Sequence, residues 1–227
     1  LQAREEGKII AGELALAAGR IKSPIIGVTG SNGKTTVTSL LGHLLQTGNQ
    51  RVFVGGNIGT PVLDFLSIPQ DVNALVLELS SFQLEIGGEF RPDIGLLLNL
   101  SPDHIDRHGS LANYIAAKRR IFANQGADDV AIIGSDDASV MQEKITTAGR
   151  VLRFGVQSSS EALVEDNGVL LRGRAFGLDH DEFYELSQTA LSSFINRLNA
   201  AAAILAARIY GCNSEAIRTG LAGYVLP

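Results

Sequence analysis

The sequence predicts an α/β fold with a mostly parallel sheet and helices on both of its faces. Five short apolar runs, almost free of charge, recur between residues 25 and 133, and segments with helical periodicity separate them. Strands of a parallel sheet are buried on both faces and therefore read as continuous apolar runs. Polar groups follow several of these runs, which is typical of a ligand site at the carboxyl edge of the sheet.

Composition supports a globular domain and disfavours some classes of binding partner. The 227 residues are 45% hydrophobic, which suffices for a large core, and the formal net charge of −5 disfavours binding to nucleic acid or anionic membranes. Cys212 is the single cysteine, which excludes an intrachain disulfide and suits a reducing cytoplasm. The sequence has no signal peptide and no apolar run long enough to span a bilayer. We expect a cytoplasmic monomer.

Both ends of the chain look like cuts in a longer protein. The first residue is Leu1 rather than methionine, and Pro227 directly follows an apparent helix. Residues 1–20 contain a short strand candidate, Lys8–Ile10, and a brief helical pattern, Glu13–Ala18. We expect them to end a preceding domain and to lead into a nucleotide-binding domain over residues 21–227.

The expected elements of the parallel section follow from apolar runs, caps and breakers. After the strand that begins at Ile25, a helix from Lys34 should end near Gly48, a natural C-cap residue. Thr60 and Pro61 suit the N-cap and first position of a helix. The further strands and helices are Arg51–Val54, Val62–Leu66, Ala74–Leu77, Ile94–Leu98, a helix from N-cap Ser110 through Phe122, Val130–Ile133 and Ala138–Thr147.

The pattern changes at Arg150. Val151–Phe154 and the residues around Asn167-Gly168 predict short antiparallel strands or a hairpin, so we expect a small antiparallel section over residues 150–190. Helices resume at Ile195–Tyr210 and Ser214–Tyr224, and the alanine-rich stretch of the first should pack closely.

The stretch around residues 25–40 predicts a polyphosphate site. An apolar strand leads into a loop with Gly30 and Gly33, and Lys34 and Thr35 open a helix. Glycines allow backbone N–H groups to approach phosphate oxygens, and the helix N-terminus adds its positive dipole end. Lysine can reach the terminal phosphates, and the threonine hydroxyl can bind the accompanying Mg²⁺. A plain glycine-rich turn is the alternative, and Val28 departs from the general P-loop spacing.

Polar groups also follow three other strands. Glu78 comes after four apolar residues, so it is either a metal ligand or a buried carboxylate paired with backbone N–H groups or a lysine. His104, beside Asp103, is either a metal or substrate ligand or a structural histidine. Asn57 lies in the loop Gly55–Gly59, which a plain turn would explain nearly as well.

The residues around Lys118 do not by themselves predict a functional role for this lysine. Alanines precede it, Ile121 and Phe122 follow it, and composition alone predicts an exposed lysine on the helix. The cluster Lys118-Arg119-Arg120 is then interpreted as one polar helix face rather than as a nucleic-acid patch.

Taken together, these motifs resemble the muramyl ligase family, ATP-dependent enzymes that build the peptide of bacterial cell-wall precursors. The matching stretches are Thr29–Thr36, Gly55–Gly59, Glu78–Glu85, Ser101–His108 and Tyr114–Lys118. The resemblance covers about residues 9–227 and implies a P-loop NTPase-like fold. It implies that residues 1–20 end a uridine-binding N-terminal domain, that residues 21–227 form the central ATP-binding domain, and that a C-terminal domain is absent.

The stretch Glu78–Glu85 is similar to a narrower group, the members that add D-glutamate to UDP-N-acetylmuramoyl-L-alanine. In that reaction ATP phosphorylates the substrate carboxylate, and the amine of D-glutamate displaces phosphate from the acyl phosphate. The resemblance thus implies a ligase of peptidoglycan synthesis, needed for cell shape and division. Since two substrate-binding domains lie outside residues 21–227, we expect the chain alone to be inactive.

The resemblance assigns roles to individual residues. It implies that ATP is held by the loop and by an asparagine pair one helical turn apart, where Ile195 replaces a histidine common in the family. It implies two Mg²⁺ sites and a lysine carbamylated by CO₂, with catalysis resting on Lys34, Glu78, His104 and Lys118. The assigned residues are Gly30, Ser31, Asn32, Gly33, Lys34, Thr35, Thr36, Asn196 and Asn199 for ATP; Thr35, Glu78, His104 and carbamylated Lys118 for Mg²⁺; and Asn57, Ser80, Gln83 and His104 for the muramoyl substrate.

Other functions stay open at this point. Another amide ligase of the family, including a folylpolyglutamate synthase-like one, shares the phosphate loop. A P-loop module that hydrolyses nucleotide as a switch would leave Asp103, His104 and Lys118 without a purpose. A non-catalytic nucleotide-binding scaffold would not need Lys34, Thr35 and Glu78 together.

Overall fold

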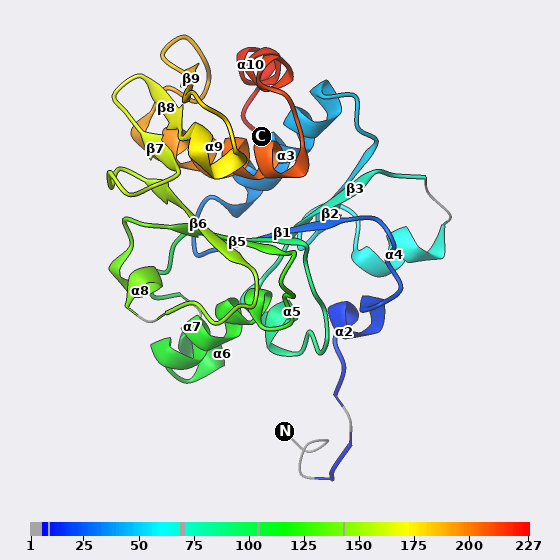
Figure 1. Ribbon diagram of the computed structural model, residues 1–227. Coiled ribbons are helices and arrows are strands. Elements are labelled where there is room, and N and C mark those ends of the chain that lie inside the picture. Colours follow the sequence, from blue (N-terminus) through cyan, green and yellow to red (C-terminus); the bar gives the residue numbers. More distant parts are fainter. Residues whose placement is uncertain (1–5, 9, 69–70, 104, 143) are drawn as a thin grey trace.

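A computed structural model describes residues 6–8, 10–68, 71–103, 105–142 and 144–227. Over these residues the strands form one nine-stranded sheet, and helices pack on both faces of it (Figure 1). The strand order is β2-β3-β1-β4-β5-β6-β7-β8-β9, so β1 lies between β3 and β4. The strands are β1 (Ile25–Thr29), β2 (Val52–Gly56), β3 (Ala74–Glu78), β4 (Ile94–Leu97), β5 (Val130–Gly134), β6 (Arg150–Gly155), β7 (Ala162–Val164), β8 (Gly168–Leu171) and β9 (Glu182–Glu185).

The predicted fold class is confirmed. Every neighbouring pair from β2 to β7 in the strand order is parallel, and the pairs β7–β8 and β8–β9 are antiparallel. The turn around Asn167-Gly168 joins β7 and β8, as predicted. Val151–Phe154, however, lies in β6, which pairs parallel with β5, so the prediction of an antiparallel strand there was wrong.

The helices divide between the two faces of the sheet (Figure 1). On one face lie α3 (Lys34–Thr47), α9 (Phe194–Tyr210) and α10 (Ser214–Gly223). The other face carries α2 (Glu13–Ala17), α4 (Val62–Ser67), α5 (Ser81–Glu85), α6 (Ile105–His108), α7 (Leu111–Arg119) with the 3₁₀ turn η1 (Arg120–Phe122), and α8 (Ala138–Met141). A second 3₁₀ turn, η2 (Gly173–Phe176), lies between β8 and β9. No described helix has the length and apolarity needed to cross a membrane.

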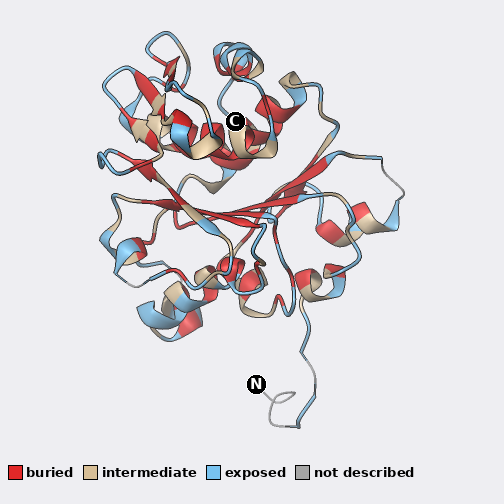
Figure 2. Ribbon diagram, viewed as in Figure 1, coloured by how far each residue is buried: buried red, intermediate tan, exposed pale blue. Residues whose placement is uncertain are grey.

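Each face of the sheet has its own apolar core (Figure 2). The first core joins Val37, Leu40 and Leu44 of α3 to the alanine-rich stretch of α9, whose residues 200–207 are all buried. Alanine side chains let α9 lie close to α3 and the sheet, which is the close packing the sequence predicts. The second core holds Leu14 of α2, so the N-terminal helix packs on the same sheet.

Several predicted boundaries were wrong. Lys8 and Ile10 are not in a strand, and Ile9 lies outside the described residues. The helix predicted over 138–147 ends at Met141, with Asp137 as its N-cap. Pro61, rather than Thr60, is the N-cap position of α4; Pro61 supplies no cap, and Oε1 of Glu13 accepts from the N–H of Leu63 in the first turn at 3.1 Å.

Two glycines in the middle of the sheet let η1 approach it. Gly27 of β1 and Gly95 of β4 are paired in register. A Cβ atom on Gly95 would lie 3.1 Å from Cε1 of Phe122; one on Gly27 would lie 2.9 Å from Cδ1 of Leu79 and at an ordinary 3.4 Å from Cδ1 of Ile121. Because η1 continues α7, the close packing of Ile121 and Phe122 over these glycines sets how near α7 comes to β1.

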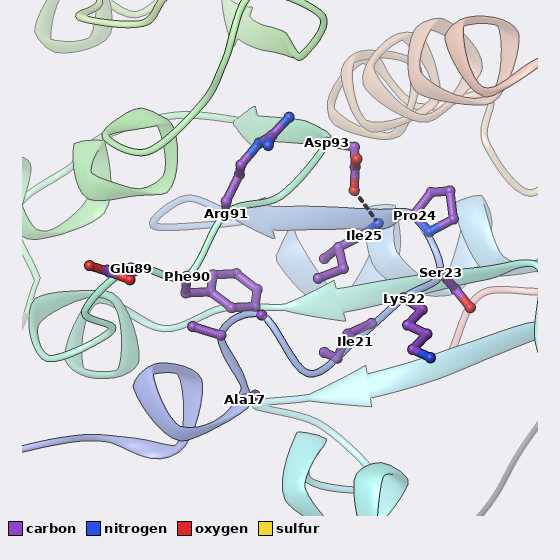
Figure 3. Close-up of a pocket in the computed structure, with 12 residues that line it drawn as sticks. Ala17, Ile21, Lys22, Ser23, Pro24, Ile25, Glu89, Phe90, Arg91 and Asp93 are labelled. Carbon is purple, nitrogen blue, oxygen red and sulfur yellow. Dashed lines mark hydrogen bonds between the residues drawn. The ribbon is translucent and has the colours of Figure 1, made fainter.

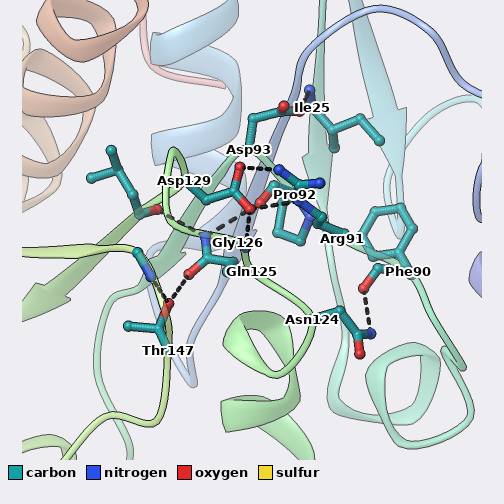
Figure 4. Close-up of polar contacts among 12 residues, drawn as sticks. Ile25, Phe90, Arg91, Pro92, Asp93, Asn124, Gln125, Gly126, Asp129 and Thr147 are labelled. Atoms are coloured by element: carbon teal, nitrogen blue, oxygen red, sulfur yellow. Dashed lines mark hydrogen bonds and ion pairs between the residues drawn. The ribbon is translucent and has the colours of Figure 1, made fainter.

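The buried carboxylate of Asp129 connects the segments that lead into β4 and β5 (Figure 4). Asp129 accepts hydrogen bonds from Nε and Nη2 of Arg91, at 2.6 and 2.8 Å, and from the backbone N–H of Gly126 at 2.6 Å. The Asp129 side chain is 3% exposed, whereas that of Arg91 is 49% exposed. The ion pair raises the pKa of Arg91, chiefly through this hydrogen bond.

We expect Asp129→Asn to lower the free energy of unfolding by about 2 kcal/mol, because it removes the charge from two charge-assisted hydrogen bonds. Urea unfolding followed by circular dichroism measures the change. Asp128→Asn is the matched control, since Asp128 is exposed and only its charge acts on Arg91. Equal destabilisation by the two variants would contradict the assignment.

Candidate functional site

The loop between β1 and α3 is shaped to receive an anion. Gly33 adopts φ +83°, a conformation that L side chains rarely accept, and a Cβ on Gly30 would lie only 2.9 Å from Cβ of Leu98. Both glycines are therefore required by the backbone path. The loop leaves β1 between β3 and β4, at the carboxyl edge where ligands of open parallel sheets bind.

The N-terminus of α3 is open. In α5, α7, α8, α9 and α10 an N-cap side chain accepts a hydrogen bond from the first turn, but Gly33 of α3 supplies none. The first-turn N–H groups of a helix have no carbonyl partner within the helix. In this fourteen-residue helix they face the loop together with the positive end of the dipole, which is how helices bind phosphate groups.

Two lysines meet at one carbonyl oxygen of this loop. Nζ of Lys34 donates to the carbonyl oxygens of Gly30 and Ser31 at 3.0 and 3.1 Å. Nζ of Lys118 donates to the same Gly30 oxygen at 2.9 Å. Two ammonium groups therefore lie against this loop. A bound anion would neutralise part of their positive charge.

The exposed position predicted for Lys118 from composition was wrong. Lys118 is 2% exposed, and its Nζ lies 4.8 Å from the ring centroid of Tyr114. Burial, and then the charge of Lys34, lowers the pKa of Lys118 from 10.5 to about 8. With Lys118 buried, residues 118–120 do not form one polar face, so that prediction was also wrong.

Glu78 is buried and paired. It is 2% exposed, and it accepts hydrogen bonds from Oγ1 of Thr35 and Nδ2 of Asn57, both at 2.8 Å. A backbone bond from the N–H of Asn57 to the Glu78 carbonyl oxygen, also 2.8 Å, fixes the Gly55–Gly59 loop beside it. The structure therefore brings together three residues from segments far apart in the sequence, and the charge of Glu78 also acts on Lys118.

The oxygen atoms of Thr35 and Glu78 suit Mg²⁺. This ion binds one or two carboxylates and completes its shell with water and substrate phosphates rather than a protein cage. Among the described residues no group of three or more histidine, cysteine, aspartate or glutamate side chains could hold a metal ion. His104 lies outside the described residues, so its predicted role as a metal and substrate ligand is not placed.

The asparagine pair at the start of α9 borders the phosphate loop. Nδ2 of Asn199 donates to Oδ1 of Asn196 at 3.3 Å, and Oδ1 of Asn199 would clash with any Cβ on Gly33. Ile195, at the position of the family's histidine, is 69% exposed. A cavity of about 420 Å³ opens beside the pair and is lined by Leu98, Asn99, Gly134, Asp136, Asp137, Ala138, Phe154, Leu198 and Asn199.

The other predicted residues form hydrogen bonds to neighbouring parts of the protein. Ser80 and Gln83 form a capping box on α5, and Nε2 of Gln83 also donates to Glu13 at 3.2 Å. The carbonyl oxygen of Thr36 accepts a bond from the hydroxyl of Tyr224 at 3.3 Å. His108, interpreted from the sequence as structural, is buried with Nε2 3.0 Å from Oγ of Ser81.

Sequence reasoning missed three residues around the loop. Tyr114 places its hydroxyl 2.8 Å from Oγ of Ser31. Asn99 bonds to the backbone of Asn32, and Asp137 accepts from the N–H of Leu100 at 2.6 Å. Asn99 follows β4, so the strand-end rule that singled out Glu78 would also have found it.

A second cavity, of about 390 Å³, lies at the opposite edge of the sheet (Figure 3). Ala17, Pro24, Phe90 and neighbouring residues line it, and Oδ2 of Asp93 accepts from the N–H of Ile25 at 2.7 Å beside it. It contains none of the predicted site residues.

Comparisons with known proteins show the family of this chain. Residues 28–207 match the Mur ligase middle domain. Two similar curated proteins, from Desulfotalea psychrophila and Acidobacterium capsulatum, are 46% and 43% identical and are both named UDP-N-acetylmuramoylalanine–D-glutamate ligase. The matches cover 98% and 96% of this chain but 48% of each relative, so the chain spans about half their length.

Solved structures share the fold. MurF from Acinetobacter baumannii superposes with a TM-score of 0.72 at 20% identity, covering 90% of this chain and 46% of that one. MurF ligase from Thermotoga maritima in complex with ADP gives 0.71 at 22% identity, covering 94% and 51%. FolC from E. coli, in complex with DHPP and ADP, gives 0.65 at 18% identity, covering 97% and 63%.

The pKa of Lys118 makes stability depend on pH. Because folding lowers this pKa, the unfolded chain binds more protons between pH 8 and 10.5, and stability rises with pH there. The cost of the charged lysine, at most about 3 kcal/mol, is fully present below pH 8. We expect Lys118→Met to remove this dependence. Urea unfolding of both proteins from pH 7 to 10 measures it, and parallel curves would contradict the assignment.

Proposed function

The chain belongs to the Mur ligase family, and we propose that residues 21–227 are the central ATP-binding domain of a ligase that adds D-glutamate to UDP-N-acetylmuramoyl-L-alanine. The observation that carries this proposal is the uncapped N-terminus of α3 with Lys34, Thr35 and Glu78 around it. The names of the relatives support the substrates, and the paired Glu78 and Asn57 support a second reactant beside the phosphates.

The proposed reaction has two steps. The carboxylate of UDP-N-acetylmuramoyl-L-alanine attacks the γ-phosphorus of ATP, the bond to the β–γ bridging oxygen breaks, and ADP leaves. The amine of D-glutamate then attacks the acyl carbon, loses a proton and expels inorganic phosphate. Phosphorylation is needed because a free carboxylate is a poor acyl donor.

In this mechanism the chain positions the phosphates and neutralises their charge. The loop Gly30–Thr36 surrounds the β- and γ-phosphates and binds them through the backbone N–H groups from Gly33 onward. Lys34 moves from the carbonyl oxygens of Gly30 and Ser31 to the phosphate oxygens, where its charge stabilises the transferring group. Asn196 and Asn199 hold the adenine in the adjoining cavity.

Four residues are proposed to hold Mg²⁺: Thr35, Glu78, His104 and Lys118. Mg²⁺ would offset the repulsion between the two anionic reactants. Lys118 must first be carbamylated, because an ammonium group cannot bind a cation, and CO₂ adds only to the neutral amine. The lowered pKa of Lys118 supports this, since it raises the neutral fraction near pH 7.

The remaining roles concern the muramoyl substrate and the rest of the protein. Asn57, Ser80, Gln83 and His104 are proposed to contact that substrate. Residues 1–20 are proposed to end a uridine-binding domain, with a D-glutamate-binding domain after residue 227, so that residues 1–227 alone do not ligate. The whole enzyme is proposed to act as a cytoplasmic monomer in peptidoglycan synthesis, and thereby in cell shape and division.

A substrate screen on the full-length protein tests the function. We expect ATP-dependent phosphate release with UDP-N-acetylmuramoyl-L-alanine and D-glutamate, and none with L-alanine or diamino acids in place of D-glutamate. Lys34→Ala should lower the rate at least about a hundredfold with an unchanged circular dichroism spectrum, because it removes the charge at the phosphates. If phosphate is released without any amino acid and no acyl phosphate can be trapped, the protein is a nucleotide-hydrolysing switch instead.

Chemical rescue tests the role of Lys118. We expect Lys118→Ala to lose most activity and to regain part of it when short carboxylic acids are added, since these can replace the carbamate. Lys34→Ala should show no such recovery. The measurement is phosphate release against acid concentration, and equal rescue of both variants would argue against the carbamate.

A further inference from the structure

Asn99 braces the phosphate loop from the neighbouring strand. Its Oδ1 accepts a hydrogen bond from the N–H of Asn32 at 2.8 Å, and its Nδ2 donates to the carbonyl oxygen of Asn32 at 3.0 Å. Its backbone carbonyl oxygen accepts from the N–H of Ser31 at 3.0 Å. One residue of the β4 end thus satisfies three backbone groups at the tip of the loop.

The geometry points to Asn99 as a positioning residue that selects which N–H groups of the loop face the nucleotide phosphates. The N–H groups of Ser31 and Asn32 are occupied by Asn99, so they are directed away from the ligand side. The N–H groups left for phosphate are those of Gly33 and the open first turn of α3. This inference rests on the proposed function, because it concerns how the same loop binds ATP.

The brace also orients the carbonyl groups that hold the lysines. Lys34 donates to the oxygens of Gly30 and Ser31, and Lys118 donates to that of Gly30. Each of these carbonyl groups belongs to a peptide whose N–H, that of Ser31 or of Asn32, donates to Asn99. Rotation of the loop tip would therefore displace both ammonium groups along with the phosphate-binding N–H groups.

Asn99 is itself held in place. The next residue, Leu100, donates its N–H to Oδ2 of Asp137 at 2.6 Å, and Oδ1 of Asp137 caps α8. The N–H of Ser101 donates to Oγ of Ser31 at 2.9 Å. Residues 99–101 thus connect the phosphate loop to the end of β5, which makes the brace a rigid part of the fold.

Two variants of the full-length protein, Asn99→Ala and Asn99→Ser, test the inference. Calorimetric titration with ADP should show Kd raised about tenfold or more, and the KM for ATP should rise in parallel while that for D-glutamate stays unchanged. Hydrogen exchange should become faster in a peptide that covers residues 30–36. A purely structural role would lower the melting temperature without changing nucleotide affinity.

Asn124→Ala is the matched control. Nδ2 of Asn124 donates to the carbonyl oxygens of Gly88 and Phe90, both at 3.0 Å, at the opposite edge of the sheet. It removes similar side-chain-to-backbone bonds and should leave ADP binding unchanged. Equal loss in this control, or an ADP Kd within twofold of wild type in both Asn99 variants, would overturn the inference.

Lys34→Ala separates this outcome from failure of the proposed function. If Lys34→Ala binds ADP as wild type does, the loop does not hold the phosphates, and the proposed function fails. If Lys34→Ala loses ADP binding while both Asn99 variants retain it, the loop binds nucleotide without the brace. Only the inference about Asn99 is then wrong.

Discussion

The pairing of β1 with both β3 and β4 is the constraint on which the site depends. The in-register hydrogen bonds of this central strand place three chain segments at one edge: the phosphate loop after β1, Glu78 at the end of β3, and Asn99 after β4. None of these segments is near another in sequence. A shift of β1 by one residue would exchange its faces and separate the loop from both neighbours.

The positive charges gathered at this site lower the stability of the folded protein. Two ammonium groups lie on one carbonyl oxygen, and one of them is almost fully buried. Burial and the charge of Lys34 lower the pKa of Lys118, and the carboxylates of Asp103 and Glu78 offset this only in part. If the proposed nucleotide binds here, its phosphates would neutralise part of this positive charge, so the relief of repulsion would add to the binding contacts.

Local patterns predicted the fold well, and tertiary contacts explain where they failed. The apolar runs and the Lys34–Thr35 motif are local, so the strands and the phosphate loop could be predicted from sequence. The burial of Lys118 could not, because α7 has little amphipathic character and its depth depends on η1 reaching the sheet. Likewise β6 starts with an exposed arginine and is only partly buried along its length, and its pairing with β5, which the sequence does not encode locally, makes it parallel. The brace of Asn99 links residues 67 positions apart, which no local pattern encodes.

The paired glycines Gly27 and Gly95 have a consequence for how such a protein can evolve. They touch no ligand, yet the space above them admits Ile121 and Phe122, and that approach carries Lys118 to the loop. A methyl group on Gly95 would press on Phe122, push η1 and the end of α7 away from the sheet, and so separate the Lys118 ammonium group from Gly30. The size of a residue at the centre of the sheet, far from any ligand, thus affects where a lysine lies at the edge of the sheet.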